Sequence, residues 1–142
     1  MKQPLLATDN ITELLVKIIE FTHLRQKILI RNINSMHSLN FVPRDLAVEE
    51  FSGLLTIALC EHNACRKLLF CDSPNIKFGL AGAFAAAPLI DSISKCLLKR
   101  DPNEFLRAQI NKLFENALNQ RIASQLLKTK QAEEKSLRGC SN

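Results

Sequence analysis

Apolar residues recur near the start of the chain at steps of three and four positions, the spacing of one face of an α-helix. They are Ile11, Leu14, Ile18, Phe21, Leu24 and Ile28. Asn10, with Glu13 three positions later, has the composition of a capping box. The pattern predicts a helix over residues 10–35.

A second set of apolar residues makes this helical face wider than contact with one neighbouring helix requires. The set is Leu15, Ile19, Leu29 and Ile33. A helix that is apolar over so much of its circumference needs more than one neighbour. We therefore expect it to lie centrally in a bundle or to contact a second chain.

A strong helix start lies in the last third of the chain, where Asp101 can cap, Pro102 takes the first helical position and Glu104 the third. An apolar stripe follows, made of Leu106, Ile110, Leu113 or Phe114, Ala117 or Leu118, Ile122 and Leu126. The pattern predicts a helix over residues 101–137. Two long terminal helices with matching stripes most simply pair as an antiparallel, coiled-coil-like unit.

The middle of the chain is less regular. Residues 45–70 are typical of a helix capped by Asp45. The inward positions of that helix would be Val48, Phe51, Leu55, Ala58, Cys65 and Leu69. Residues 71–79 have the composition of a turn, and residues 88–99 predict a short helix.

Composition favours helices over sheet, because the chain has no Trp, no Tyr and only four glycines. The prediction is an all-α fold. It comprises a single domain over residues 1–142, with an irregular helical middle over residues 45–100 between the two long helices. At 142 residues the chain is long enough to bury a core.

The net charge of +5 is spread along the chain and does not form one dense basic block. The best candidate for a nucleic-acid surface is Arg121, Lys128, Lys130, Lys135 and Arg138. Glu133 and Glu134 interrupt it, and no stacking aromatic residue lies nearby. A solvated helix face is the better interpretation, so we expect no nucleic-acid partner.

Catalytic and metal-binding motifs are not evident. The five cysteines lack CxxC spacing. Cys60, His62, Cys65 and Cys71 could be ligands, but buried packing of cysteine is the favoured interpretation. The glycines are too dispersed for a phosphate loop, and the histidines do not form HExxH. We expect a non-enzyme with no cofactor, metal or small-molecule substrate.

Targeting signals are also not evident. Residues 1–10 lack the apolar region and cleavage site of a secretory signal. The longest uncharged run, residues 78–90, is too short to span a bilayer. We expect synthesis in the cytoplasm and no cleavable signal peptide.

The segment RQKILIRNINSMHSLNFVPRDL, residues 25–46, begins as a helix and has no proline or glycine before residue 43. It resembles the motif RQ-x-x-L-x-x-N-I-A-N-A-x-T-P-G-Y-x-x-R-D-L of flagellar basal-body rod proteins. The matching positions include Asn32, Ile33, Phe41 and Asp45. Asn40 stands where the family has glycine, and Asn is the residue other than glycine that best tolerates a left-handed conformation. We expect the helix to end here in a turn.

The last helix resembles the same family through its segments Glu115-Asn116-Ala117-Leu118, Ala123-Ser124-Gln125-Leu126-Leu127 and Lys135-Ser136-Leu137-Arg138-Gly139. The resemblance covers the first and last thirds of the chain and is closest to proximal-rod subunits. Leu39 replaces the family's proline, which frees φ and restores an N–H donor. The chain is a divergent member by this comparison.

The resemblance implies a structural subunit of the proximal rod in the bacterial flagellar basal body. Such a subunit leaves the cytoplasm through the flagellar type III export apparatus and polymerises in the periplasmic rod. Its partners would be other rod subunits, the export apparatus and MS-ring base, and further copies of itself.

Apolar positions on the two terminal helices form our predicted assembly surface. They are Ile18, Phe21, Leu24, Ile28, Leu113, Leu118, Ile122 and Leu126. Head-to-tail contacts of this kind propagate and do not close. Two alternatives remain: a self-contained helical bundle that binds a partner helix as an adaptor or export chaperone, and a small DNA-binding domain.

Overall fold

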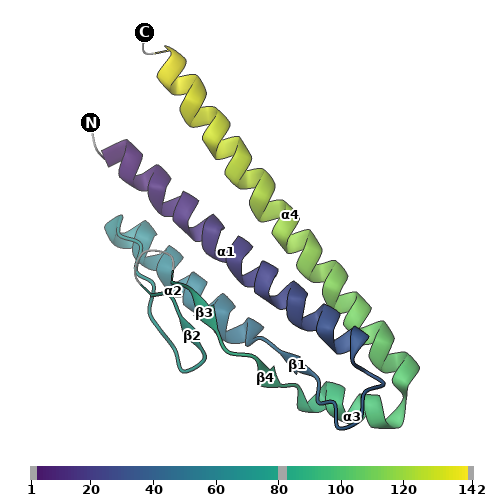
Figure 1. Ribbon diagram of the computed structural model, residues 1–142. Helices are drawn as coiled ribbons and strands as arrows, with labels where there is room; N and C mark the ends of the chain where they lie inside the picture. The colour runs from purple at the N-terminus through teal and green to yellow at the C-terminus, as the bar shows by residue number, and fades with distance from the viewer. Residues whose placement is uncertain (1–2, 80–82, 141–142) are drawn as a thin grey trace.

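The computed structural model describes residues 3–79 and 83–140, and these residues form four helices and four two-residue strands. In chain order the elements are α1 (Gln3–Asn34), β1 (Arg44–Asp45), α2 (Val48–Cys65), β2 (Ile76–Lys77), β3 (Ala85–Ala86), β4 (Leu89–Ile90), α3 (Ser92–Arg100) and α4 (Pro102–Cys140). The long helices α1 and α4 lie side by side along the molecule (Figure 1). The predicted all-α fold with paired terminal helices is confirmed.

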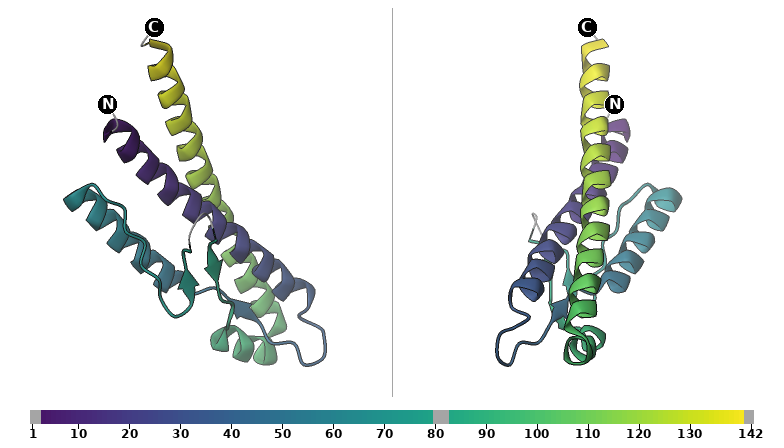
Figure 2. Two further views of the ribbon diagram at one scale, coloured as in Figure 1. Left: turned by 60° about the vertical axis from the view of Figure 1, so that its left-hand side comes forward. Right: turned by 90° about the vertical axis from the view of Figure 1, so that its right-hand side faces the viewer.

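Both α2 and α4 run antiparallel to α1. On one side, Asn32 near the end of α1 contacts Gln109, whereas Thr22, earlier in α1, contacts Asn116, which lies later in α4. The two helices therefore run in opposite directions. On another side, Phe21 stacks on Phe51 while Asn10 contacts Arg66, near the end of α2. Figure 2 shows α1 flanked by these two helices, with both chain termini at the same end of the molecule.

The start of α1 differs from the prediction. The helix extends upstream to Gln3, so Asn10 lies within it and is not its cap. The Asn10 amide instead donates to the Arg66 carbonyl at 3.2 Å and lies 3.4 Å from His62 Nδ1. Asn10 therefore ties the end of α2 to α1.

The end of α1 follows the prediction. The helix stops at Asn34, and backbone hydrogen bonds from Ser38 to Ser35 and from Phe41 to Ser38 form the turn. Asn40 has φ = 60°, the left-handed conformation expected of it. Asn40 thus takes a backbone conformation that glycine adopts readily, six residues after the helix ends.

Helix α2 is shorter than predicted and starts later. Asp45 lies in β1 and does not cap it; Ala47 occupies the cap position without a side-chain bond. The helix ends at Cys65 because Arg66 adopts φ = 58°. Its buried residues are Phe51, Leu54, Ala58 and His62. The prediction that Cys65 and Leu69 point inward was wrong, since both are exposed.

Two small antiparallel sheets replace part of the predicted helical middle. Strand β1 pairs with β4, with Arg44 opposite Ile90, and β2 pairs with β3. The predicted helix over residues 88–99 therefore begins only at Ser92, where Asp91 caps it by accepting from Ser94 N at 3.1 Å. Pairing with β1 takes Leu89 and Ile90 out of that helix.

The turn after β2 depends on Gly79, which has φ = 67°. A Cβ added at this position would collide with the backbone carbonyl of Ala83. Only glycine fits both the left-handed backbone and the close approach of the two segments.

The core lies between α1, α2 and the β2–β3 pair and is rich in phenylalanine. Phe51 stacks on Phe21 with ring centroids 4.0 Å apart, and Phe78 stacks on Phe70 at 4.6 Å. Phe84 packs edge-on against Phe51. These rings fix α2 and the β2–β3 pair against α1 without contribution from α4.

Candidate assembly surface

The face of α4 that packs against α1 is unexpectedly polar. Gln109 is fully buried and Asn116 is 2% exposed, with Phe105 and Ala123 as buried apolar neighbours on the same face. The apolar stripe predicted from the sequence is exposed at Ile110, Leu118, Ile122 and Leu126, the last three of which are predicted assembly residues. The buried side of α4 is the side that forms hydrogen bonds. Hydrophobic periodicity in the sequence does not reveal such bonds.

Two hydrogen bonds hold this seam between α1 and α4, and a third joins α4 to α3. Asn116 Nδ2 donates to the Thr22 carbonyl at 2.7 Å, and Asn32 Nδ2 donates to Gln109 Oε1 at 3.0 Å. Gln109 Nε2 then donates to Ser94 Oγ at 3.2 Å. Because buried amides must find partners, these bonds favour one register of α4 on α1.

Asn32 also closes the turn that follows α1. Its Nδ2 donates to the Arg44 carbonyl at 2.7 Å, and its Oδ1 accepts from Arg44 N at 3.1 Å. One side chain therefore binds the backbone of β1 and the side chain of Gln109 together. The end of α1, strand β1 and α4 meet at this residue.

An ion-pair chain runs beside Asn32. Arg25 binds both carboxylate oxygens of Asp45, at 2.9 and 3.0 Å. Lys112 contacts Asp45 at 3.3 Å and Asp91 at 2.7 Å, and Ser94 Oγ donates to Asp91 at 2.6 Å. Together with the amides above, the polar network consists of Arg25, Asn32, Asp45, Asp91, Ser94, Gln109 and Lys112. It joins α1, β1, α3 and α4.

Electrostatics stabilise the charged form of Asp91. Burial raises the pKa of this carboxyl, but hydrogen bonds from Lys112 and Ser94 and the charge of Lys112 lower it by more. The pKa of Asp91 therefore lies below its ordinary value. The carboxylate is ionised at neutral pH and serves both as helix cap and as ion-pair partner.

The predicted assembly residues fall into distinct environments. Phe21 is buried in the core, and Ile18, Leu24 and Ile28 pack partly buried against it. Leu113 is also partly buried. Only the three α4 residues Leu118, Ile122 and Leu126 are exposed, each by about half of its surface. Those predicted assembly residues that are exposed therefore all lie on α4.

One exposed group on α4 forms what we call the outer ridge: Ile110, Phe114 and Leu118, which are 38%, 73% and 58% exposed. Residues four apart lie one above the other on a helix. Leu118 is nine residues from Gln109, about two and a half turns, so it lies on the side away from α1. The apolar stripe predicted from the sequence includes these positions, with Phe114 as an alternative to Leu113 and Leu118 as an alternative to Ala117.

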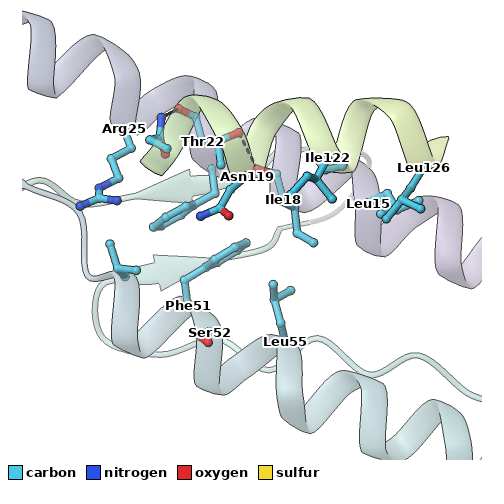
Figure 3. A pocket seen from close by; sticks show the side chains of 14 residues that line it. Leu15, Ile18, Thr22, Arg25, Phe51, Ser52, Leu55, Asn119, Ile122 and Leu126 are labelled. Atoms are coloured by element: carbon cyan, nitrogen blue, oxygen red, sulfur yellow. Dashed lines mark hydrogen bonds between the residues drawn. The ribbon is translucent and has the colours of Figure 1, made fainter. Parts of the chain in front are cut away.

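A second apolar surface is the three-helix groove, a cavity of about 310 Å³ between α1, α2 and α4 (Figure 3). Phe51 and Leu55 project into it from α2, opposite Ile18 of α1 and Ile122 of α4. The full lining is Leu15, Ile18, Phe21, Thr22, Arg25, Val48, Phe51, Ser52, Leu55, Asn116, Asn119, Ile122, Ala123 and Leu126. The groove takes in four of the predicted assembly residues.

Most of the residues singled out in segment 25–46 lie outside this groove, since Asn32, Asn40, Phe41 and Arg44 line a second cavity. Arg25 lines the groove and pairs with Asp45, while Asn32 and Arg44 bind one another. Asn40 turns the backbone, and Phe41 and Ile33 are both partly buried. Their spacing in sequence was the only signal for this cluster.

The cysteine prediction was wrong. Cys60, Cys65, Cys71 and Cys96 are exposed thiols and not buried hydrophobes, because the buried face of α2 is taken by Phe51, Leu54, Ala58 and His62. The side chain of Cys140 lies outside the described residues. Across the described parts of the chain, no group of three or more His, Cys, Asp or Glu residues is arranged to hold a metal.

No helix within residues 3–79 and 83–140 has the length and apolar character needed to cross a bilayer. Residues 80–82, part of the uncharged run considered in the sequence, lie outside this description. Comparison with known proteins finds no matching family model, no matching curated protein and no matching solved structure. Function is therefore inferred from the residues and their geometry.

Proposed function

We propose that the protein is a structural subunit of the bacterial flagellar proximal rod, exported by the flagellar type III apparatus and assembled through its paired terminal helices. The observation that supports the proposal is that the motif residues contact one another. Among the residues that support the resemblance to rod proteins, Arg25 binds Asp45 and Asn32 binds the backbone of Arg44, both at the joint after α1. A motif with this degree of mutual contact is a structural unit.

The surfaces of α4 support a role in assembly. Helix α4 exposes Phe114, Leu118, Ile122 and Leu126 along its length. Contiguous exposed apolar surface on a folded protein marks an interaction site. The polar network meanwhile holds the helix pair in one register, so a neighbouring subunit meets a defined surface.

The test of the proposal is made in the bacterium that encodes the chain. Deleting the gene should abolish hook and filament assembly, and an antibody should detect the protein in isolated basal bodies. Rescue with Asn40→Gly should succeed, because glycine adopts φ = 60° freely, whereas Asn40→Val should rescue poorly. Normal flagella after deletion, with no protein in basal bodies, would overturn the rod assignment.

A helical-bundle adaptor or export chaperone is the second candidate, favoured by the three-helix groove. The groove is apolar, open and walled by helices, which is how a partner's amphipathic helix is commonly bound. A chaperone would stay in the cytoplasm as a one-to-one complex with an exported protein. Its absence from basal bodies together with such a complex would favour this function.

A further inference from the structure

We infer that the exposed face of α4 pairs with the same face of α4 in a second copy of this chain, around a two-fold axis at Leu118. The contact goes beyond the proposed function, because a two-fold contact closes at two copies and does not by itself extend a rod. It involves the outer ridge and the two residues that continue it, Ile122 and Leu126.

The apolar residues of this face are arranged symmetrically about Leu118. Ile110, Phe114, Leu118, Ile122 and Leu126 follow one another at a constant spacing of four, and all are exposed. Helix α4 forms one edge of the molecule, with α1 along its inner side (Figures 1 and 2). A two-fold contact requires a self-complementary surface of this kind, because each copy presents the same residues to the other.

The spacing of four also determines how two such helices cross. Side chains at i and i+4 form a ridge inclined to the helix axis, and ridges of this kind from two helices interdigitate at a crossing angle of about −50°. Each step of four residues turns the ridge by about 40° around the helix, since a turn takes 3.6 residues. Phe114, Leu118 and Ile122 therefore face the partner together, whereas Ile110 and Leu126 lie at the edges of the contact.

Two charged residues flank the ridge at equal distances from Leu118. Glu115 lies three residues before Leu118 on one flank, and Arg121 lies three residues after it on the other flank. Both are exposed, and neither forms an ion pair or hydrogen bond with another residue among those that the structure describes. Both charges are therefore available to a second chain.

The proposed two-fold axis brings these opposite charges together. An axis that runs along the ridge exchanges its two flanks, so Arg121 of each copy faces Glu115 of the other. The contact then consists of an apolar centre with an ion pair on each side. Complementary charges at matched positions fix the register of such a contact and favour a second α4 as the partner.

The first test removes the centre of the contact. The purified full chain should show a concentration-dependent equilibrium between monomer and dimer in analytical ultracentrifugation. Leu118→Glu places two carboxylates against each other at the axis and should leave only monomer. Leu137→Glu, which changes another exposed leucine of α4 outside the contact, is the matched control and should pair like the wild type.

The second test uses the two charges. Glu115→Arg or Arg121→Glu alone brings like charges together and should weaken pairing about 10-fold, the loss expected from two surface ion pairs. A mixture of these two variants should form a mixed dimer, because opposite charges then meet again. Both substitutions in one chain should restore wild-type pairing for the same reason. Glu133→Arg reverses an exposed charge outside the contact and should have no effect.

Folding is checked separately from pairing. All these substitutions are at exposed positions, where changes in stability are small. The variants should therefore keep the wild-type circular dichroism spectrum. They should also keep its melting temperature at concentrations where the wild type is monomeric.

Several outcomes would overturn the inference. A wild type that stays monomeric at every concentration, or a dimer that survives Leu118→Glu, would remove the contact. If neither the mixture nor the doubly substituted chain pairs, Arg121 does not face Glu115 and the two-fold arrangement is wrong. Assembly beyond a dimer that is lost in Leu118→Glu would contradict a contact that closes. All these measurements concern the free protein, so the rod assignment still depends on the basal-body experiment.

Discussion

The two faces of α4 invert the usual arrangement of an amphipathic helix. The face against α1 buries Gln109 and Asn116, whereas the opposite face exposes Phe114 and Leu118. On α2 the ordinary pattern holds, with Phe51, Leu54 and Ala58 inside. The difference shows that α4 buries hydrogen-bonded amides beside Phe105 and Ala123, and keeps much of its apolar surface for other contacts.

Buried hydrogen bonds between two helices discriminate strongly between the possible registers of those helices. A buried amide that loses its partner costs more than the bond contributes when formed, so the penalty for an incorrect register is large. Apolar contacts tolerate sliding much better. We conclude that the seam sets the position of α4, and that the exposed face then offers a fixed surface to neighbours.

The strongest test of the comparison replaces one phenylalanine on each face. Phe105→Ala should lower the free energy of unfolding by about 3–5 kcal/mol, because the ring is fully buried and a cavity remains. Phe114→Ala should change it by no more than about 0.5 kcal/mol, as expected for an exposed position. Urea denaturation of both variants measures the contrast, and similar losses would refute it.

A smaller effect is expected from the polar seam. Asn32→Ala should cost about 3 kcal/mol, because Arg44 N–H, the Arg44 carbonyl and Gln109 all lose a buried partner. Asn34→Ala, two residues later and exposed, is the matched control and should be nearly neutral. If both asparagines behave alike in denaturant unfolding, the seam does not set the register.

The smallest effect concerns acid sensitivity. The pKa of Asp91 is lowered in the folded chain, so its contribution to stability is present above the ordinary Asp pKa of about 3.9 and is lost as the pH falls below it. Asp91→Asn should be less stable than the wild type at pH 7, and the difference should shrink toward pH 3. Unfolding free energies across this range give the comparison. A difference that stays constant would mean that the Asp91 charge contributes nothing.

The sequence correctly predicted the features that depend on residues close together in the chain. The start of α4 follows from Asp101, Pro102 and Glu104, and Asp101 Oδ1 does accept from Glu104 N at 3.3 Å. The end of α1 and the left-handed Asn40 were predicted from adjacent residues. In each case the determining contacts span only a few positions.

Features that depend on distant partners were missed. Asn116 binds Thr22 across 94 positions, and Gln109 binds Asn32 across 77. Hydrophobic periodicity cannot register a polar residue that is buried because it has a partner elsewhere. The predicted apolar stripe therefore contains Ile110 and Leu118, whereas Gln109 and Asn116 are the residues enclosed.

The number of residues between the end of α1 and the end of α4 also determines how long α1 waits during synthesis for its partner helix. The ribosome must add 106 residues after Asn34 before Cys140, the last residue of α4, is made, which takes roughly 5–20 s at synthesis rates of about 5–20 residues per second. During that interval Thr22 and Asn32 of α1 lack the partners that α4 supplies.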